Sequence, residues 1–237
     1  MLRFFRRGIN FFCRRYFRKK RFLEKTVYQK KAEAHADFDY SPSSHHKKIA
    51  SRIEPLLSFD PIHPEEWRRQ AKSKLKELLA FEEQTGSVAA DRIWSAEDSQ
   101  AKIEKLHLQV GDEYGFPIYR CCPKDLDPPY SWIICLQGHS SGMHNSIGVD
   151  GEEERYRSDP IGGRDFANWC TRQGYAALCI EQSSLGERRE KQLVKTSPHP
   201  CHDAAMHALI LGKTLMAERM HDVHWALEFL RASESEG

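Results

Sequence analysis

The run Ser131 to Asp150, SWIICLQGHSSGMHNSIGVD, decides the fold. It begins with five apolar residues that do not alternate with polar ones, Trp132 to Leu136, a pattern that suits a central strand covered on both faces. A loop rich in Gly, His and Ser follows directly. In an open α/β sheet such a loop lies at the carboxyl edge, where these folds bind their ligands.

Two later segments continue this pattern: DPIGGRDFANWCTRQGYAALCIEQSSLGERRE (Asp159 to Glu190) and LILGKTLMAERMHDVHWALEFL (Leu209 to Leu230). Together with the first run they resemble, in order, the α/β-hydrolases, and in particular a bacterial esterase group called acetyl xylan esterase-like or dienelactone hydrolase-like. The resemblance covers Trp67 to Leu230. It implies an α/β fold, a mostly parallel sheet with flanking helices. We expect this hydrolase domain to be incomplete, because the family's nucleophile strand, acid and histidine do not follow before Gly237.

The resemblance assigns an oxyanion loop to Gly138, His139, Ser140, Ser141 and Gly142. Ester hydrolysis passes through a tetrahedral oxyanion, and one preorganised N–H donor is typically worth about 3 to 4 kcal/mol. The backbone N–H of His139 corresponds to one donor, whereas the second belongs to the missing nucleophile segment. Glu187 and Arg188 correspond to the rim of the site and are candidate substrate contacts, although surface or inter-loop salt bridges are the alternative. The complete protein is expected to act on a small ester without a cofactor, and the 237-residue chain alone is expected to be inactive.

A second interpretation concerns the same loop, since residues 138 to 142 themselves satisfy Gly-x-Ser-x-Gly. A nucleophile elbow is a sharp turn from a strand into a helix. Met143 to Gly151 has two glycines and no apolar face at helical spacing, which indicates a loop instead. The oxyanion-loop interpretation is therefore favoured. Ser140 as a nucleophile and an ordinary Gly/Ser turn remain alternatives.

Three parts are expected along the chain: a basic aromatic arm (1–31), a linker with a short helix at Lys47 to Glu54 (32–63), and a partial α/β-hydrolase domain (64–237). Pro64 opens a helix over Glu65 to Glu83, whose apolar face predicts packing outside the sheet and a core position for Trp67. Further strands and one helix are expected at Ile103 to Val110, Phe116 to Cys121, Ser131 to Leu136, Arg164 to Gln173 (a helix closed by Gly174) and Tyr175 to Ile180.

The arm carries a strong local charge. Residues 1 to 31 hold twelve Lys/Arg and one acid, a net of +11, which leaves −9 for residues 32 to 237. Aromatic and basic residues recur on different sides at helical spacing, which predicts a basic amphipathic helix able to lie on an anionic membrane surface. The residues that carry this prediction are Arg3, Phe5, Arg7, Phe12, Arg14 and Arg18. A disordered extension, a targeting segment and a nucleic-acid contact remain alternatives, and nucleic acid is not the expected partner. If the arm is the active part, the chain is a noncatalytic membrane-surface or binding module.

The cysteines and histidines point to no metal site. Seven cysteines form an odd set without a Cys-x-x-Cys pair, which favours reduced thiols in a cytoplasmic protein, with peripheral membrane attachment through the arm as an option. Several histidines and a cysteine gather between His199 and His207, but their spacing matches no standard zinc motif. Asp222 and Arg219 are expected to fix the long helix to a neighbouring loop.

Overall fold

The computed structural model describes residues 38–138, 141–191 and 199–235. The chain divides into two compact units, Met1–Ser58 and Phe59–Gly237. The basic arm lies outside the described residues, so its helix and its membrane contact stay predictions. In the first unit the described part holds helix α3 (Pro42–Ala50). The short helix predicted at Lys47 to Glu54 is present but ends at Ala50 and starts earlier, because the side chain of Ser41 accepts a hydrogen bond from the N–H of Ser44 (3.3 Å).

The second unit is built on a five-stranded sheet with the order β1-β2-β3-β5-β4. β4 and β5 run parallel, while the other three pairs among the described residues are antiparallel. The sheet is therefore mixed, and the mostly parallel sheet expected from the sequence is not confirmed. The strands are β1 (Val88–Glu97), β2 (Ala101–Val110), β3 (Tyr114–Pro123), β4 (Trp132–Leu136) and β5 (Ala176–Ile180). β1 was not predicted, because its mostly exposed residues show no clean alternation.

The order of the strands places β5 inside the sheet and β4 at its edge. Every residue of β5 is buried, and β5 lies between β3 and β4. In the described sheet the run Trp132 to Leu136 therefore lies at the edge, although its apolar pattern is that of a central strand. The apolar run does form a strand, but it pairs on one side only among the described residues, and its Ile133 and Leu136 stay partly exposed.

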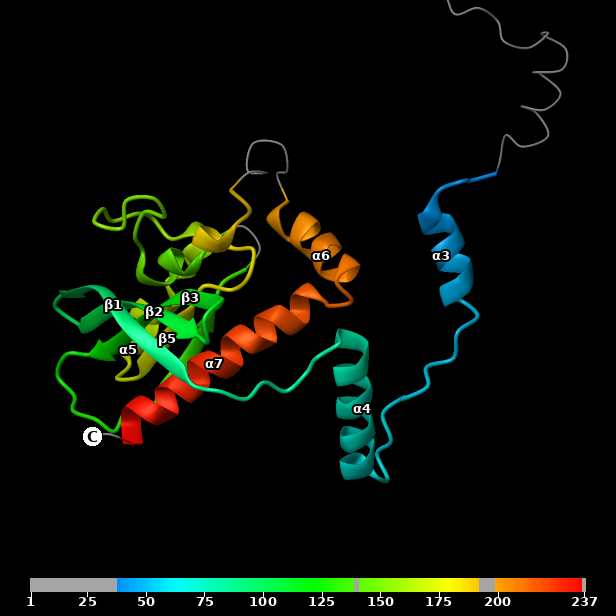
Figure 1. The fold of residues 1–237 in the computed structure, drawn as a ribbon, viewed down its shortest axis with the longest axis horizontal. Helices are drawn as coiled ribbons and strands as arrows, with labels where there is room; N and C mark the ends of the chain where they lie inside the picture. Colours follow the sequence, from blue (N-terminus) through cyan, green and yellow to red (C-terminus); the bar gives the residue numbers. More distant parts are fainter. Residues whose placement is uncertain (1–37, 139–140, 192–198, 236–237) are drawn as a thin grey trace, which may run out of the picture. The chain divides into compact units, whose positions relative to one another are not determined.

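Helices cover both faces of this sheet (Figure 1). On one face α5 (Phe166–Arg172) and the 3-10 helix η1 (Met143–Ile147) pack on Cys135, Cys179 and Tyr119. On the other face α7 (Leu215–Ser235) packs on β2, β3 and β5 through Trp225, Ala226, Phe229 and Leu230. Gly174, with φ +80°, closes α5 as predicted, and two more 3-10 helices, η2 (Ile161–Gly163) and η3 (Gly186–Arg188), lie in the loops.

The segment Leu209 to Leu230 was predicted as one helix, and this was wrong. The structure has α6 (Pro200–Ile210) and α7, separated by a turn at Gly212 with φ +69°. Thr214 begins the second helix, because its hydroxyl oxygen accepts the N–H of Ala217 at 3.1 Å. The hydroxyl also donates to the carbonyl of Leu79 at 2.7 Å, which ties the end of α4 to the start of α7.

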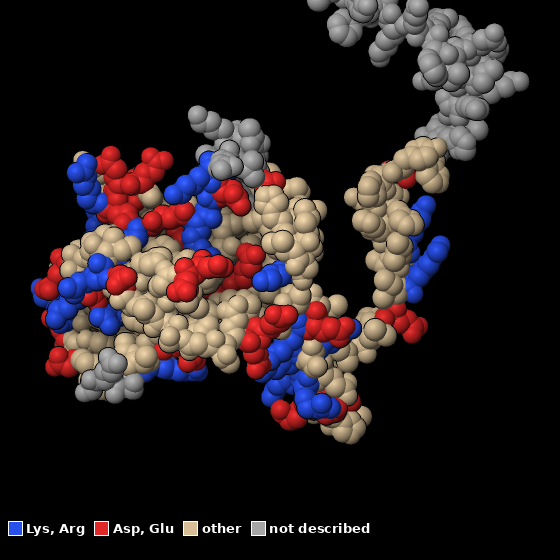
Figure 2. Space-filling view, viewed as in Figure 1, with Lys and Arg blue, Asp and Glu red and all other residues tan. Residues whose placement is uncertain are grey.

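Helix α4 (Pro64–Leu79) starts where Pro64 predicts and ends before Glu83, because Ala80 takes the left-handed conformation. None of its residues is fully buried. Trp67 lies edge-on against Phe59, with ring centroids 5.0 Å apart, and belongs to neither core cluster. Acidic and basic side chains are interspersed on α4 (Figure 2), in pairs such as Arg68 with Glu65. Among the described residues no helix is both long and apolar enough to cross a membrane.

Candidate functional site

The loop after β4 is held from within by a buried amide. Gln137 Nε2 donates to Ser146 Oγ at 2.7 Å and to the carbonyl of Arg164 at 2.8 Å. Its Oε1 accepts the hydroxyl of Ser141 and the side-chain amide of Asn145, each at 3.3 Å. One side chain therefore joins Ser141, near the end of the predicted oxyanion loop, to η1 and to the segment at Arg164. His139 and Ser140 lie outside the described residues, so the position of the expected N–H donor stays a prediction.

A buried carboxyl meets the far end of this loop. Glu181 follows β5, is 1% exposed, and accepts the N–H of Met143 at 3.0 Å and the N–H of Glu187 at 3.3 Å. Burial raises its pKa to about 7, even though both N–H groups and Arg188 favour the charged form; the negative charge of Glu187 acts in the same direction as burial. Glu181 thus links the loop after β4 to η3.

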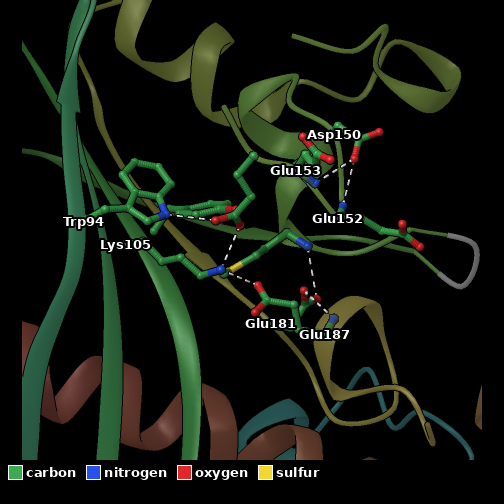
Figure 3. Close-up of polar contacts among 10 residues, drawn as sticks. Trp94, Lys105, Asp150, Glu152, Glu153, Glu181 and Glu187 are labelled. Atoms are coloured by element: carbon green, nitrogen blue, oxygen red, sulfur yellow. Dashed lines mark hydrogen bonds and ion pairs between the residues drawn. The ribbon is translucent and has the colours of Figure 1, made fainter. Parts of the chain in front are cut away.

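Lys105 stands beside Glu181 and connects two further loops. It is 5% exposed on β2, and its Nζ donates to Glu154 at 2.8 Å and to Glu187 at 2.6 Å. Burial opposes its charge, but the two carboxylates outweigh that effect and raise its pKa. Trp94 Nε1 also donates to Glu154 at 2.8 Å. Figure 3 shows Trp94, Lys105, Glu181 and Glu187 converging on one region from strands β1 and β2 and the loop after β5.

Arg188 lies in a second buried cluster. Its guanidinium donates to the fully buried Asp222 at 2.7 Å, to the hydroxyl of Tyr114 at 2.9 Å and to the carbonyl of Glu181 at 2.9 Å. Asp222 also accepts the N–H of Ser183 at 2.9 Å. This cluster fixes α7 to the loop after β5. In this structure the side chains of Glu187 and Arg188 are both engaged in ion pairs, which is the alternative given from the sequence. Substrate contact by Glu187 and Arg188 stays a prediction.

Arg219 also contacts the loop after β5, so that it and Asp222 both fix α7 to this loop, as predicted. It donates to the carbonyl of Ser183 at 3.1 Å, to Ser184 Oγ at 3.0 Å and to Cys201 Sγ at 3.1 Å. The other residues of the His199 to His207 segment do not gather around a common point: His207 faces Glu190 at 3.8 Å, and His202 faces Asp203 at 3.3 Å. Within the described ranges no group of three or more His, Cys, Asp or Glu residues is arranged to hold a metal ion.

Sequence reasoning missed Lys105, Glu154, Glu181 and His144. His144 lies in η1, where burial lowers its pKa against the opposing effect of acids that include Glu154 and Asp150. A lone Lys in an alternating strand and a Glu directly after a buried strand are weak signals. Of the four residues, Glu181 had the more useful signal, because it follows a strand at the sheet edge where ligands bind.

The comparisons with known proteins bear on the fold. No protein-family model matches the chain, and no curated protein matches it. A solved structure from Bacteroides fragilis, described as a candidate acetyl xylan esterase, superposes with a TM-score of 0.68 at 16% identity over 83% of this chain and 51% of that one. The acetyl xylan esterase of Paenibacillus sp. R4 gives a TM-score of 0.30 at 15% identity, over 58% of this chain and 37% of that one, which is too weak to carry an argument. The chain thus spans about half the length of the first structure and is similar to it in fold.

Proposed function

We propose that this chain forms the oxyanion-loop side of a serine ester hydrolase, and that it lacks the nucleophile, the acid and the base. The observation that carries the proposal is the loop after β4, whose Ser141 to Met143 end is hydrogen-bonded to the buried side chains of Gln137 and Glu181. Backbone donors stabilise an oxyanion best when they are fixed before the reaction, since they then need no reorganisation. The fold similarity to a candidate acetyl xylan esterase supports the same conclusion and makes acetate esters the first substrates to test.

In this proposal the residues 138 to 142 have separate tasks. The N–H of His139 donates to the oxyanion, while Gly138 and Gly142 let the backbone approach its neighbours closely. A Cβ on Gly142 would lie 2.6 Å from the Cα of Gly186, so a side chain at this position would push the loop away from η3. The second donor and the serine that attacks the ester carbon come from a segment outside residues 1–237 in this proposal.

The test is hydrolysis of 4-nitrophenyl acetate by two forms of the protein. The 237-residue chain is expected to give the background rate, equal to that of its Ser140→Ala variant with the fold checked by circular dichroism. A form extended along the coding sequence past Gly237 is expected to hydrolyse the ester. In that form His139→Pro removes the N–H donor and should lower kcat by about 10² to 10³.

Three outcomes would contradict the proposal. Hydrolysis by the 237-residue chain that is lost in Ser140→Ala would make Ser140 the nucleophile. An extended form that folds but does not hydrolyse acetate or longer-chain esters would contradict the proposed ester hydrolase activity. A His139→Pro variant with unchanged kcat would remove the assigned donor.

A further inference from the structure

The carboxyl of Glu181 is enclosed by the backbones of two separate loops. The carboxyl lies between two glycines from different loops: a Cβ on Gly142 would come within 2.7 Å of Oε2, and a Cβ on Gly186 within 2.1 Å. The backbones of the two loops can meet at this point because both residues lack a side chain. The carboxyl is therefore enclosed only while the two loops stay together.

We propose that Glu181 is a positioning residue that latches the Gly142–Met143 end of the loop to η3, and that the latch is closed when its carboxyl is protonated and is released when the carboxyl ionises. Opening of either loop would expose the carboxyl to water. A neutral carboxyl loses little by staying enclosed, whereas a carboxylate gains its hydration when the loops part.

Proton linkage determines whether rising pH opens or closes the latch. The pKa of Glu181 is about 7 in the closed arrangement, against 4.5 for an ordinary glutamate, so the closed form binds the proton more tightly. Rising pH therefore favours the open form, beginning above about 4.5 and levelling off above about 7. Since one pKa unit corresponds to a factor of ten, the gap allows an increase in the opening equilibrium of at most about 300-fold.

The neighbours of Glu181 determine where this transition falls. Glu187 is a like charge that disfavours the carboxylate, and Arg188 is an opposite charge that favours it. Lys105 from β2 neutralises part of the effect of Glu187 by pairing with it at 2.6 Å. The other titratable groups on the elements packed here are Tyr119 on β3, Glu154 in the loop after η1, and His144 on η1. Of all these groups, Glu187 offers the cleanest way to move the transition without touching the latch contact to Met143.

The experiment is amide hydrogen exchange on the 237-residue chain from pH 5 to 8.5, with each rate corrected for the intrinsic exchange of an open peptide. The protection factor of the Met143 amide is expected to fall by tenfold to a hundredfold across this range. The Ser183 amide, which donates to Asp222 in the same loop, is the internal reference, and its protection is expected to fall less than that of Met143. Glu181→Gln, which keeps the shape and one acceptor oxygen but cannot ionise, should make the protection of Met143 independent of pH.

Glu187→Gln is the second variant, and it should move the fall in protection to lower pH because it removes the neighbouring negative charge. Equal curves for the wild-type chain and Glu181→Gln would overturn the latch, as would a fall at Ser183 as large as that at Met143. The value of the latch for catalysis rests on the proposed function, because it would then control the shape of the oxyanion loop. Amide exchange is measured without an ester, so a negative esterase test does not affect the exchange result. A negative exchange result likewise does not affect the esterase test.

Discussion

At the scale of single residues, the sequence showed the loop but not the side chains that hold it. Residues 138 to 142 stand out in the sequence as a glycine-rich loop after an apolar strand. The role of Lys105 could not be predicted from the sequence, because its partners Glu154 and Glu187 lie 49 and 82 positions away in the chain. The alternation Leu106, Leu108, Val110 also assigns Lys105 to an outer face. In the structure that face is covered too, because Ile103 and Tyr119 belong to the core under α5 and η1.

Glu181 predicts a pH dependence of global stability. A carboxyl with a raised folded pKa stabilises the fold below its unfolded pKa, and this contribution is lost as pH rises through the folded value of about 7. The full difference corresponds to about 3 kcal/mol between pH 4.5 and pH 7. Urea unfolding across this range gives the free energy of unfolding of the wild-type chain and of Glu181→Gln. As pH rises, the wild-type chain should lose stability relative to the variant. A constant difference would show that Glu181 titrates normally.

Asp222 predicts a large loss of stability on truncation. It is fully buried and accepts hydrogen bonds from Arg188, Tyr114 and the N–H of Ser183. Asp222→Ala leaves the mostly buried guanidinium of Arg188 without its charged partner, which typically costs about 3 to 5 kcal/mol. The free energy of unfolding in urea measures this. Glu153→Ala, which removes an exposed ion pair with Arg155, is the matched control and should change stability by about 0.5 kcal/mol or less. Similar losses in both variants would refute the special role of Asp222.

At the scale of elements, strongly apolar runs and one of two glycine helix ends were predicted correctly, and weaker patterns were not. β4, β5 and the closure of α5 by Gly174 follow from continuous apolar runs and a left-handed glycine. β1 was missed because it is an edge strand with a register shift between Arg92 and Trp94 and little burial. The α6–α7 turn was missed because Gly212 in an otherwise helical pattern was not recognised as a helix end.

The hydroxyl of Thr214 holds the end of α4 to the start of α7. Its hydroxyl caps α7 through Ala217 and donates to the last carbonyl of α4, on Leu79. Thr214→Ala should destabilise the chain by about 1 to 2 kcal/mol, since it removes a helix cap and a tertiary hydrogen bond. Thr214→Ser keeps the hydroxyl and should cost less than half as much. Thermal melting compares the two, and exchange at the last turn of α4 should speed up only in the alanine variant. Equal melting temperatures would show that the hydroxyl contributes nothing.

At the scale of the whole molecule, topology was the part least accessible from the sequence. The order of elements predicts an antiparallel first pair of strands, which β2 and β3 confirm, but it does not state that β5 inserts between β3 and β4 or that β3 and β5 run antiparallel. These features depend on pairings between distant residues, such as Ile118 with Ile180.

The exposed edge of β4 predicts association between chains. Among the described strands none pairs with the outer side of β4, whose five residues carry no charge and no proline. Ile133 is 38% exposed and Leu136 is 40% exposed at this edge. Free N–H and C=O groups beside apolar side chains can pair with a strand of another molecule, and natural edges commonly prevent this with a lysine. The 237-residue chain is therefore expected to associate as its concentration rises.

Size-exclusion chromatography with light scattering, over a hundredfold range of concentration, measures this association. Ile133→Lys should shift the chain toward the monomer, because a charge at the edge must be desolvated on pairing, and the substitution alters a partly exposed position. Ile210→Lys on α6, where the isoleucine is 80% exposed, is the matched control and should leave the association unchanged. A chain that stays monomeric throughout would refute the prediction. Association lost in Ile210→Lys but kept in Ile133→Lys would place the contact on α6 and show that the edge of β4 is protected in the folded molecule.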